Sequence, residues 1–263
     1  EIVQVLAQSQ PRISRHVKIL CDAGLAQRRR EGSWVYVRSR LAAGKGQPGE
    51  SALAQAVDTF LAAAEQEDDA FAAQCTADRA RLSAIRAARS ARAAEYFAAH
   101  AAEWDQLRGL LCDPAQVERE LCDALDGDLG ALLDIGTGTG RIAEVLFRRA
   151  AHVTALDRSP DMLALARARL QDFPPERVEL VQGDFTALPF ADAAFDTITL
   201  HQVLHYAQMP ERALGEAARV MRADGRIAIV DLAPHGREEL RDTHAHARLG
   251  FADEAMADML AAA

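Results

Sequence analysis

Short apolar runs alternate with helical stretches along the C-terminal half of the chain. Runs of four to eight apolar or β-branched residues bounded by turn residues are typical of strands buried in a parallel sheet. They lie in the segments 131–157, 178–190, 195–206 and 219–232. The strand and helix alternation predicts an α/β domain, which we place at residues 112–263.

A glycine turn follows the first of these strands, with Gly136, Gly138 and Gly140 ahead of a helix. Glycines let the backbone turn sharply and approach a ligand, and the helix start offers free N–H groups. Asp157 ends the second strand, where its carboxylate could accept hydrogen bonds from both ribose hydroxyls. The spacing is not G-x-G-x-x-G, and Asp134 would repel a diphosphate but suit an amino group and a sulfonium.

The run from Asp134 to Gly140 resembles the D-x-G-x-G-x-G loop of S-adenosylmethionine-dependent methyltransferases, and the later motifs follow in that family's order. The resemblance implies a Rossmann-like class I sheet, S-adenosylmethionine as cofactor and S-adenosylhomocysteine as product. It also implies an adenine held between Asp184 and the apolar wall of Phe185. The cofactor contacts that it implies are Tyr96, Asp134, Gly136, Thr137, Gly138, Gly140, Asp157, Arg158, Met162, Asp184, Phe185 and His201.

Methyl transfer from a sulfonium depends mainly on in-line positioning, so the chemistry requires no nucleophile on the protein. Histidines His201 and His205 leave the fourth strand at the predicted pocket mouth, and His235 follows the fifth. We expect His201 to form part of the cofactor wall and His205 to be the catalytic residue on the substrate side. The segment 201–204 lacks an Asn/Asp-Pro-Pro-aromatic motif and the chain has no Pro-Cys pair. A small-molecule methyl acceptor is therefore expected rather than a nucleic-acid base.

Charge is distributed unevenly. Residues 1–40 contain eight basic and three acidic side chains, a net charge of +5, although the whole chain has a net charge of −9. A basic head on an acidic body suggests that the head alone contacts a polyanion.

The pattern of the head is helix, turn, helix and hairpin. Residues 1–7 form a short helix, Pro11 suits the first turn of a second helix, and Gly24 ends that helix. The sequence AQRRREGSWVYVRS predicts a β-hairpin that turns at Glu31 and Gly32. Apolar positions spaced for burial on one face of the second helix are Ile13, Val17 and Leu20.

This order, at residues 1–41, resembles the winged helix-turn-helix of ArsR-type repressors. The resemblance implies binding to duplex DNA, with a solvated basic face on a helical subdomain as the alternative. The first helix lacks the paired cysteines of metal-sensing members, so metal sensing is not expected. The DNA-contacting residues are expected to be Gln10, Arg12, Arg15, Lys18, Arg28, Arg29 and Arg30.

The segment 42–111 connects the two parts. Residues 42–50 are predicted to form a linker, and Ser51 to cap a helix that extends to about residue 64. Residues 68–111 are predicted to form one long helix. Such helices build the dimer in ArsR-type proteins, so a homodimer is expected. Near the end of the segment, Tyr96, His100, Trp104 and Leu107 share one stripe, which either packs on the catalytic domain or covers the cofactor as a lid.

Composition and cysteine spacing bear on the location of the protein and on metal binding. The chain has 49% hydrophobic residues but no uninterrupted apolar stretch of membrane-spanning length and no signal peptide, so we expect a cytoplasmic protein without a membrane partner. The cysteines form no C-x-x-C pair, which favours reduced thiols and no metal. A soft-metal site built from Cys75, Cys112 and Cys122 is the alternative.

Two functions stay open at this point. One is a small-molecule methyltransferase fused to a DNA-binding regulator, and the other is a regulator that senses S-adenosylmethionine or S-adenosylhomocysteine through a non-catalytic methyltransferase fold. They differ in whether an acceptor cavity lies beside the methyl group. We also expect further helices before residue 1 and a closing hairpin after residue 263.

Overall fold

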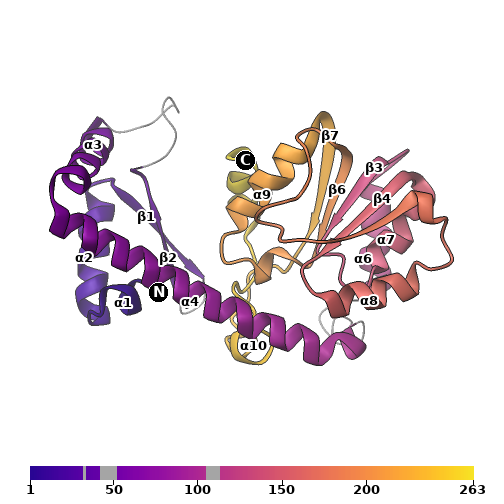
Figure 1. Cartoon of the computed structure of the whole chain (residues 1–263), viewed down its shortest axis with the longest axis horizontal. Helices are drawn as coiled ribbons and strands as arrows, with labels where there is room; N and C mark the ends of the chain where they lie inside the picture. The colour runs from indigo at the N-terminus through magenta and orange to yellow at the C-terminus, as the bar shows by residue number, and fades with distance from the viewer. Residues whose placement is uncertain (32–33, 42–51, 105–112) are drawn as a thin grey trace. The chain divides into compact units, whose positions relative to one another are not determined.

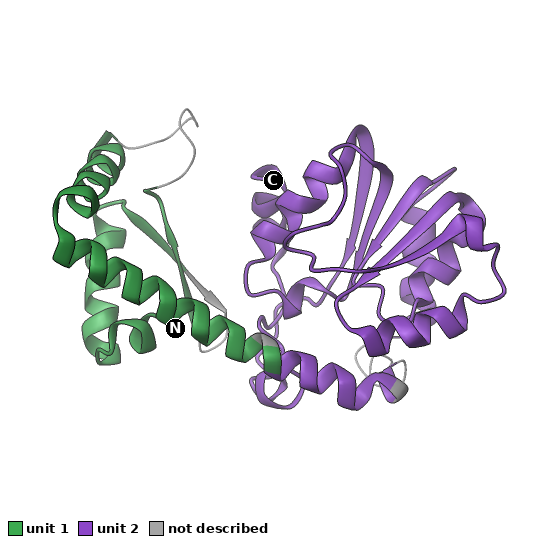
Figure 2. Cartoon of the chain, viewed as in Figure 1, with its two compact units in different colours: residues 1–91 green, residues 92–263 purple. Residues whose placement is uncertain are grey.

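The structure is a computed structural model that describes residues 1–31, 34–41, 52–104 and 113–263. The chain divides into two compact units, residues 1–91 and residues 92–263 (Figure 2). The boundary lies inside a single long helix.

The first unit contains two short helices, a two-stranded antiparallel sheet and further helix (Figure 1). Glu31 pairs with Trp34, and Gly32 of the expected turn lies outside the described residues. The elements are α1 (Ile2–Leu6), α2 (Gln10–Asp22), β1 (Ala26–Glu31), β2 (Trp34–Ser39), α3 (Ala52–Glu67) and α4 (Asp69–His100), the last of which continues into the second unit. The predicted cap Ser51 lies outside the described residues.

The first unit has a small apolar core. It includes Val5 of α1, Ile13 of α2 and Ala26 of β1, all of which are buried. Leu20, which the pattern places on the same buried face, is instead 43% exposed, because the small unit covers only one turn of that face. An ion pair of 2.6 Å between Arg89 Nη1 and Glu1 Oε1 ties α4 to α1.

Polar and basic side chains occupy the free surface of α2. Gln10, Arg12, Arg15 and Lys18 are all exposed, and Lys18 pairs with Asp22 at 2.8 Å. The three predicted wing arginines are consecutive residues of β1, and Arg28 is exposed.

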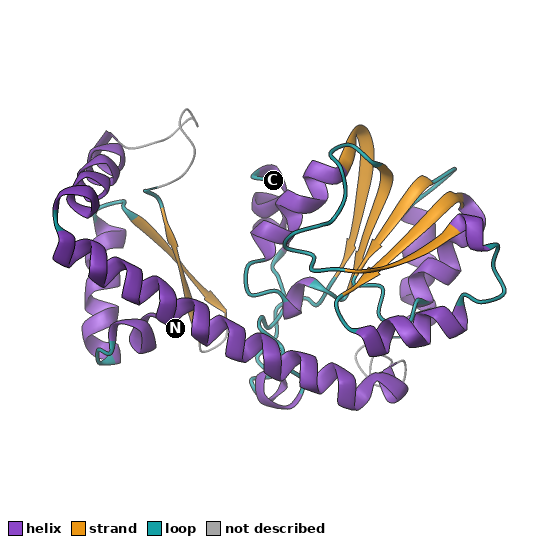
Figure 3. Ribbon diagram, in the orientation of Figure 1, coloured by secondary structure: helices purple, strands orange, loops and turns teal. Residues whose placement is uncertain are grey.

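The second unit is built on a five-stranded sheet in which all strands are parallel, in the order β5-β4-β3-β6-β7 (Figure 3). This confirms the α/β Rossmann-like sheet expected from the sequence. The strands are β3 (Gly130–Ile135), β4 (Ala150–Asp157), β5 (Val178–Gln182), β6 (Phe195–His201) and β7 (Met221–Val230). The strand order reverses direction between β3 and β6, and ligands bind outside the carboxyl ends of the strands at such a point.

Two apolar clusters cover the two faces of this sheet. One joins α9 and α11 to Leu133 and Ile198, and the other joins α6 and α7 to Leu132 and Val153. Consecutive residues of β3 are thus buried on opposite faces, which explains its unbroken apolar run. The helices of the unit are α6 (Pro114–Ala124), α7 (Arg141–Leu146), α8 (Pro160–Arg169), α9 (Pro210–Val220), α10 (Glu239–Thr243) and α11 (Asp253–Ala261).

One expected helix boundary differs in the structure. Helix α4 ends at His100 and a 3-10 turn follows at Ala101–Glu103, so the prediction of one helix to residue 111 is wrong at its end. Residues 105–112 lie outside the described part. The pairing of β7 with β6 is irregular near Gly225, because it passes from Phe195–Met221 to Thr197–Arg226.

No helix in the described ranges is both long enough and apolar enough to cross a membrane.

Candidate cofactor and acceptor site

The glycine loop begins at a buried carboxylate. Asp134, the fifth residue of β3, is 1% exposed. Its Oδ2 accepts the Thr137 hydroxyl at 2.6 Å and its Oδ1 accepts the Thr199 hydroxyl at 2.7 Å. The contact between Asp134 and the positively charged part of a ligand, which the sequence predicts, stays a prediction. In the structure this carboxylate joins β3, the loop and β6, and so fixes the shape of the loop.

Two glycines of the loop are required by their surroundings. Gly136 has φ +68°, and a Cβ there would lie 2.5 Å from Cγ2 of Val203, which follows β6. Gly140 has φ +80° and caps α7, and its Cβ would lie 3.1 Å from Ala166 in α8. L-residues with a side chain rarely adopt such φ values. The loop therefore closes on the exit of β6 and on α8 only with glycine at these positions.

Asp157 meets the same loop from the end of β4. Its Oδ2 accepts the Gly138 N–H at 2.8 Å and its Oδ1 accepts the Ser159 N–H at 2.8 Å. Burial raises the pKa of Asp157, while the N–H groups of Ser159, Gly138 and Arg158 act in the opposite direction. A carboxylate held by backbone donors beside a glycine loop suits the hydroxyls of a ribose. The accepting carboxylate therefore fits a nucleoside ligand.

Three other predicted cofactor residues lie after β4 or at the end of β6. Met162 is 2% exposed in α8 and donates its backbone N–H to Ser159 Oγ at 3.3 Å, whereas Arg158 is exposed. His201 is the last residue of β6. Their cofactor contacts stay predictions.

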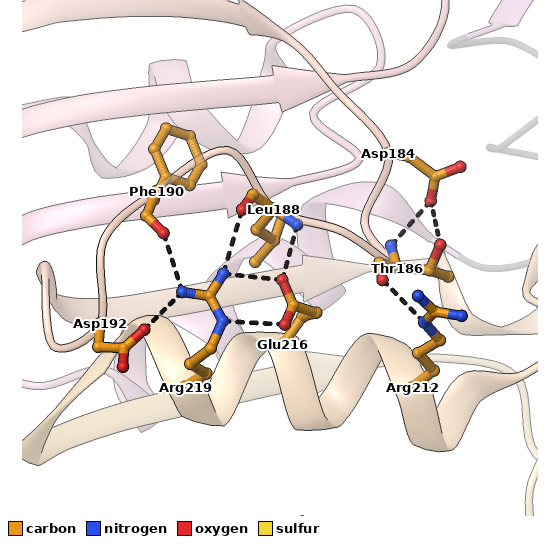
Figure 4. Close-up of polar contacts among 8 residues, drawn as sticks. All are labelled: Asp184, Thr186, Leu188, Phe190, Asp192, Arg212, Glu216 and Arg219. Atoms are coloured by element: carbon orange, nitrogen blue, oxygen red, sulfur yellow. Dashed lines mark hydrogen bonds and ion pairs between the residues drawn. The ribbon is translucent and has the colours of Figure 1, made fainter.

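Asp184 and Phe185 lie in the loop after β5, and this loop is fixed to α9 (Figure 4). Asp184 Oδ1 accepts the backbone N–H of Thr186 at 2.8 Å and its hydroxyl at 2.7 Å. Arg212 donates to the Thr186 carbonyl at 3.1 Å. Asp184 is exposed, and its second oxygen, Oδ2, points away from Thr186 in Figure 4. This orientation is compatible with the predicted bond from an adenine amino group.

A salt-bridge clamp supports the same loop farther along (Figure 4). Arg219 binds the Glu216 carboxylate, with Nη2 2.8 Å from Oε2, and also donates to the carbonyl groups of Leu188 and Phe190. The hydrogen bond from Arg219 holds the pKa of Glu216 at about 2. Both side chains are partly exposed, so the clamp positions the loop rather than contributing much stability.

Aromatic side chains gather between the end of α4 and the exit of β6. The Phe97 and Tyr206 ring centroids are 4.9 Å apart, and those of Trp104 and Tyr206 are 6.2 Å apart. A Cβ at Gly138 would lie 3.6 Å from Trp104 Nε1, so the indole lies over the glycine loop. Tyr96 packs on His100 at 4.3 Å, as the predicted stripe requires, while Leu107 lies outside the described residues.

His205 does not lie open at a pocket mouth, as the sequence suggested, because it is 1% exposed. Its Nδ1 lies 2.8 Å from Oδ1 of Asp231. Sequence reasoning missed Asp231, although this acid directly follows the apolar residues of the fifth strand. The ends of the neighbouring parallel strands β6 and β7 bring the two residues together.

A second histidine, His246, covers His205 with ring centroids 4.4 Å apart. Burial, followed by the charges of neighbouring histidines and Arg241, lowers the pKa of His246 to about 2, whereas an unfolded histidine titrates near 6.5. The unfolded state therefore binds more protons between these values. Stability is complete above pH 6.5 and falls as the pH drops toward 2.

We expect His246→Gln to flatten this acid-side loss. One proton linked to unfolding contributes at most about 1.4 kcal/mol per pH unit, so the wild type should lose about 2 kcal/mol more than the variant between pH 6.5 and pH 5. Urea unfolding of both proteins at several pH values measures the difference. Parallel losses would show that His246 is not buried in its neutral form.

The described cysteines provide no metal site. Cys21, Cys75 and Cys122 are free thiols, and within the described ranges no group of histidine, cysteine, aspartate or glutamate side chains is arranged to hold a metal ion. Cys112, the third member of the soft-metal alternative, lies outside them.

Comparison with known proteins places this site in a family. Residues 133–229 match the methyltransferase domain family. A demethylmenaquinone methyltransferase of Thermotoga maritima is 40% identical over 105 residues, which cover 39% of this chain and 44% of that protein. The demethylmenaquinone methyltransferase of Thermus thermophilus is 36% identical over 143 residues, covering 52% of this chain and 64% of that protein. The chain thus spans less than two thirds of the length of these curated relatives.

A solved structure shares the fold. An S-adenosylmethionine-dependent methyltransferase of Thermotoga maritima superimposes with a TM-score of 0.50 at 23% identity, over 64% of this chain and 78% of that chain. The chain contains a class I S-adenosylmethionine-dependent methyltransferase domain, and S-adenosylmethionine is the cofactor of this domain.

Proposed function

We propose that this protein transfers a methyl group from S-adenosylmethionine to a small molecule of the quinone type. The observation that carries the proposal is the glycine loop bonded to Asp134 and Asp157, because it places the Asp157 carboxylate beside the loop, where it suits a ribose. When bound, the cofactor supplies an electrophilic methyl group. The acceptor class follows from the demethylmenaquinone methyltransferases among the relatives.

The residues of this chain would hold the reactants rather than form a bond with them. Asp157 would accept hydrogen bonds from the ribose, and Asp184 one from the adenine amino group. Trp104 and Tyr206 would exclude water from the reacting atoms and present aromatic faces to a planar acceptor. Alignment of donor and acceptor then provides much of the rate enhancement.

The test is binding followed by turnover. Calorimetry with S-adenosylhomocysteine should give one site per chain, and methyl-labelled S-adenosylmethionine should label a reduced naphthoquinone. Binding without transfer to any small molecule would favour the alternative, a regulator that senses the cofactor through a non-catalytic fold.

We propose further that the first unit is an ArsR-type winged helix-turn-helix that binds duplex DNA. Supporting observations are the exposed side chains Arg12, Arg15 and Lys18 on α2 and the run of arginines in β1. In this arrangement α2 would enter the major groove, where Arg12 and Arg15 influence sequence preference, while the hairpin would contact phosphates.

Neutralising the wing should change the salt dependence of DNA binding. Replacing Arg28, Arg29 and Arg30 with glutamine should reduce the slope of log affinity against log salt by about 0.9 for each phosphate that the hairpin then leaves unneutralised. Fluorescence anisotropy with a 30-base-pair duplex at several salt concentrations measures this slope. The matched control replaces three exposed arginines of the second unit, Arg119, Arg148 and Arg167, with glutamine. Equal slopes in the wild type and the wing variant would contradict the wing assignment.

We also propose that the protein acts as a homodimer paired through α3. This helix exposes three large apolar side chains, with Leu53 at 52%, Phe60 at 70% and Leu61 at 37%. A two-fold axis would present two α2 helices to a palindromic site. Sedimentation equilibrium should give a dimer for the wild type and a monomer for Phe60→Glu, and a wild-type monomer at all concentrations would contradict the proposal.

A further inference from the structure

Three side chains of α9 hold the loop that follows β5 (Figure 4). Arg212, Glu216 and Arg219 lie at positions i, i+4 and i+7, which places them on one face of the helix. Arg212 donates to the Thr186 carbonyl at 3.1 Å. Farther along the loop, Glu216 accepts the Leu188 N–H at 2.8 Å, and Arg219 donates to the Leu188 carbonyl at 3.1 Å. One face of α9 therefore fixes the backbone path of this loop.

The start of the loop is bonded to the strand that ends in the predicted ribose acceptor. The N–H of Gly183 donates to the carbonyl of Asp157 at 3.0 Å. A Cβ at Gly183 would lie 2.9 Å from Cδ1 of Leu156, so the loop leaves β5 in close contact with β4. At the other end, Leu188 is 5% exposed and belongs to the apolar cluster that includes residues of α9. The loop is thus held on both sides of Asp184.

Asp184 is connected to α9 through Thr186. The Thr186 N–H and hydroxyl both donate to Asp184 Oδ1, at 2.8 and 2.7 Å, and Arg212 Nε donates to the carbonyl of the same threonine. Two donors therefore hold the carboxylate by Oδ1, and Oδ2 points away from Thr186 (Figure 4). The bonds from Arg212 to Thr186 and from Thr186 to Asp184 thus set the direction in which Oδ2 accepts a hydrogen bond.

The position of Arg212 separates this directing effect from the stability of the fold. Its side chain is exposed and lines an open recess of about 410 Å³ together with Thr186, Gly215 and Glu216. Shortening the side chain therefore leaves no buried cavity, and substitutions at such surface positions change stability little. Loss of Arg212 should act on the orientation of Asp184 rather than on folding.

We infer that Arg212 is a positioning residue for cofactor recognition, which acts through Thr186 to direct the Asp184 carboxylate at the amino group of the adenine. The inference rests on the adenine contact proposed above for Asp184 and is independent of the methyl acceptor. An amino group donates and a carboxylate only accepts, so a correctly directed Oδ2 favours adenine over a purine without that group. Arg212 therefore contributes to the selectivity of the site for an adenine nucleoside.

The test compares two ligands that differ only in this amino group. Calorimetry on the full chain measures the affinities for S-adenosylhomocysteine and for its analogue with purine in place of adenine. The wild type should prefer S-adenosylhomocysteine about 10- to 150-fold, as one hydrogen bond to a charged group provides. Asp184→Ala should lose the preference, and Arg212→Ala should reduce it by about threefold or more, comparable with the loss of one ordinary hydrogen bond. Arg212→Lys, which still offers a donor to the Thr186 carbonyl, should keep most of it.

A double variant distinguishes positioning from a general effect on the loop. If Arg212 acts through Asp184, Arg212→Ala should weaken the binding of S-adenosylhomocysteine in the wild type but not in Asp184→Ala. Arg167→Ala is the matched control, because Arg167 is an exposed arginine of α8 in the same unit, and it should keep the wild-type preference. Each preference is a ratio of two affinities on one protein, so a smaller folded fraction does not change it.

Each outcome decides the inference. A loss confined to S-adenosylhomocysteine, and seen only when Asp184 is present, supports it. An unaltered preference in Arg212→Ala, an equal loss for both ligands, or a loss that persists in the Asp184→Ala background overturns it. A wild type that binds both ligands equally contradicts the adenine contact of Asp184 and overturns the inference while the cofactor site stands. A wild type that binds neither ligand contradicts the proposed function and the inference with it.

Discussion

Replacing Asp157 with alanine is expected to weaken the binding of S-adenosylhomocysteine about 10- to 150-fold, or about 1.5 to 3 kcal/mol. Two effects combine in this result. The ribose hydroxyls lose a charged acceptor, and the N–H of Gly138 loses the bond of 2.8 Å that holds the loop against β4. A charged hydrogen bond contributes more than a neutral one, so Asp157→Asn should show a smaller part of the loss.

Calorimetry on the three proteins measures this effect, and Asp161→Ala is the matched control. Asp161 is an exposed acid in the first turn of α8, only four residues away. The substitution Asp161→Ala removes one negative charge near the site, as Asp157→Ala does, but it removes no contact with the loop. Equal affinities for Asp157→Ala and Asp161→Ala would show that the effect is one of general charge, and would contradict the ribose assignment.

The sequence predicted the part of the site that depends on neighbours along the chain. The strand, glycine loop and helix at Asp134 to Gly140 are contiguous, so their geometry follows from glycine conformation and apolar patterning. Asp157 was found for the same reason, because it ends the next strand. These local motifs gave the fold class as well as the cofactor.

Residues joined across the sheet could not be predicted in the same way. The pair His205 and Asp231 depends on β6 lying beside β7, which no local pattern specifies. The burial of His205 under the segment around His246 depends on the return of the chain after α10. The bond from the Thr199 hydroxyl to Asp134 could not be predicted either, because Thr199 lies on a different strand. Tertiary pairing decided each of these roles.

The end of helix α4 involves one local and one tertiary contact. Helix α4 has no strong breaker after residue 68, yet it ends at His100, where the His100 ring Nδ1 lies 2.8 Å from the Tyr96 carbonyl. The turn that follows brings Trp104 over Gly138. Propensity predicts that such a helix forms, while packing determines its last residue.

Gly136→Ala is expected to destabilise the second unit by about 2 to 5 kcal/mol. The left-handed φ of +68° costs an alanine about 1 to 2 kcal/mol. The added Cβ, 2.5 Å from Val203, requires a shift that costs about 1 to 3 kcal/mol, as overpacking of a core does. Because Val203 lies two residues before His205, the shift should also disturb the acceptor side of the site.

Gly215→Ala is the matched control within the same unit. Gly215 lies inside α9, and a Cβ there would meet no atom within 4 Å. Alanine should stabilise this helix by about 0.5 to 1 kcal/mol. Urea unfolding followed by calorimetry with S-adenosylhomocysteine should therefore give changes of opposite sign in stability, and weaker binding in Gly136→Ala alone. Equal stabilities of Gly136→Ala and wild type would mean that the loop does not close against the exit of β6.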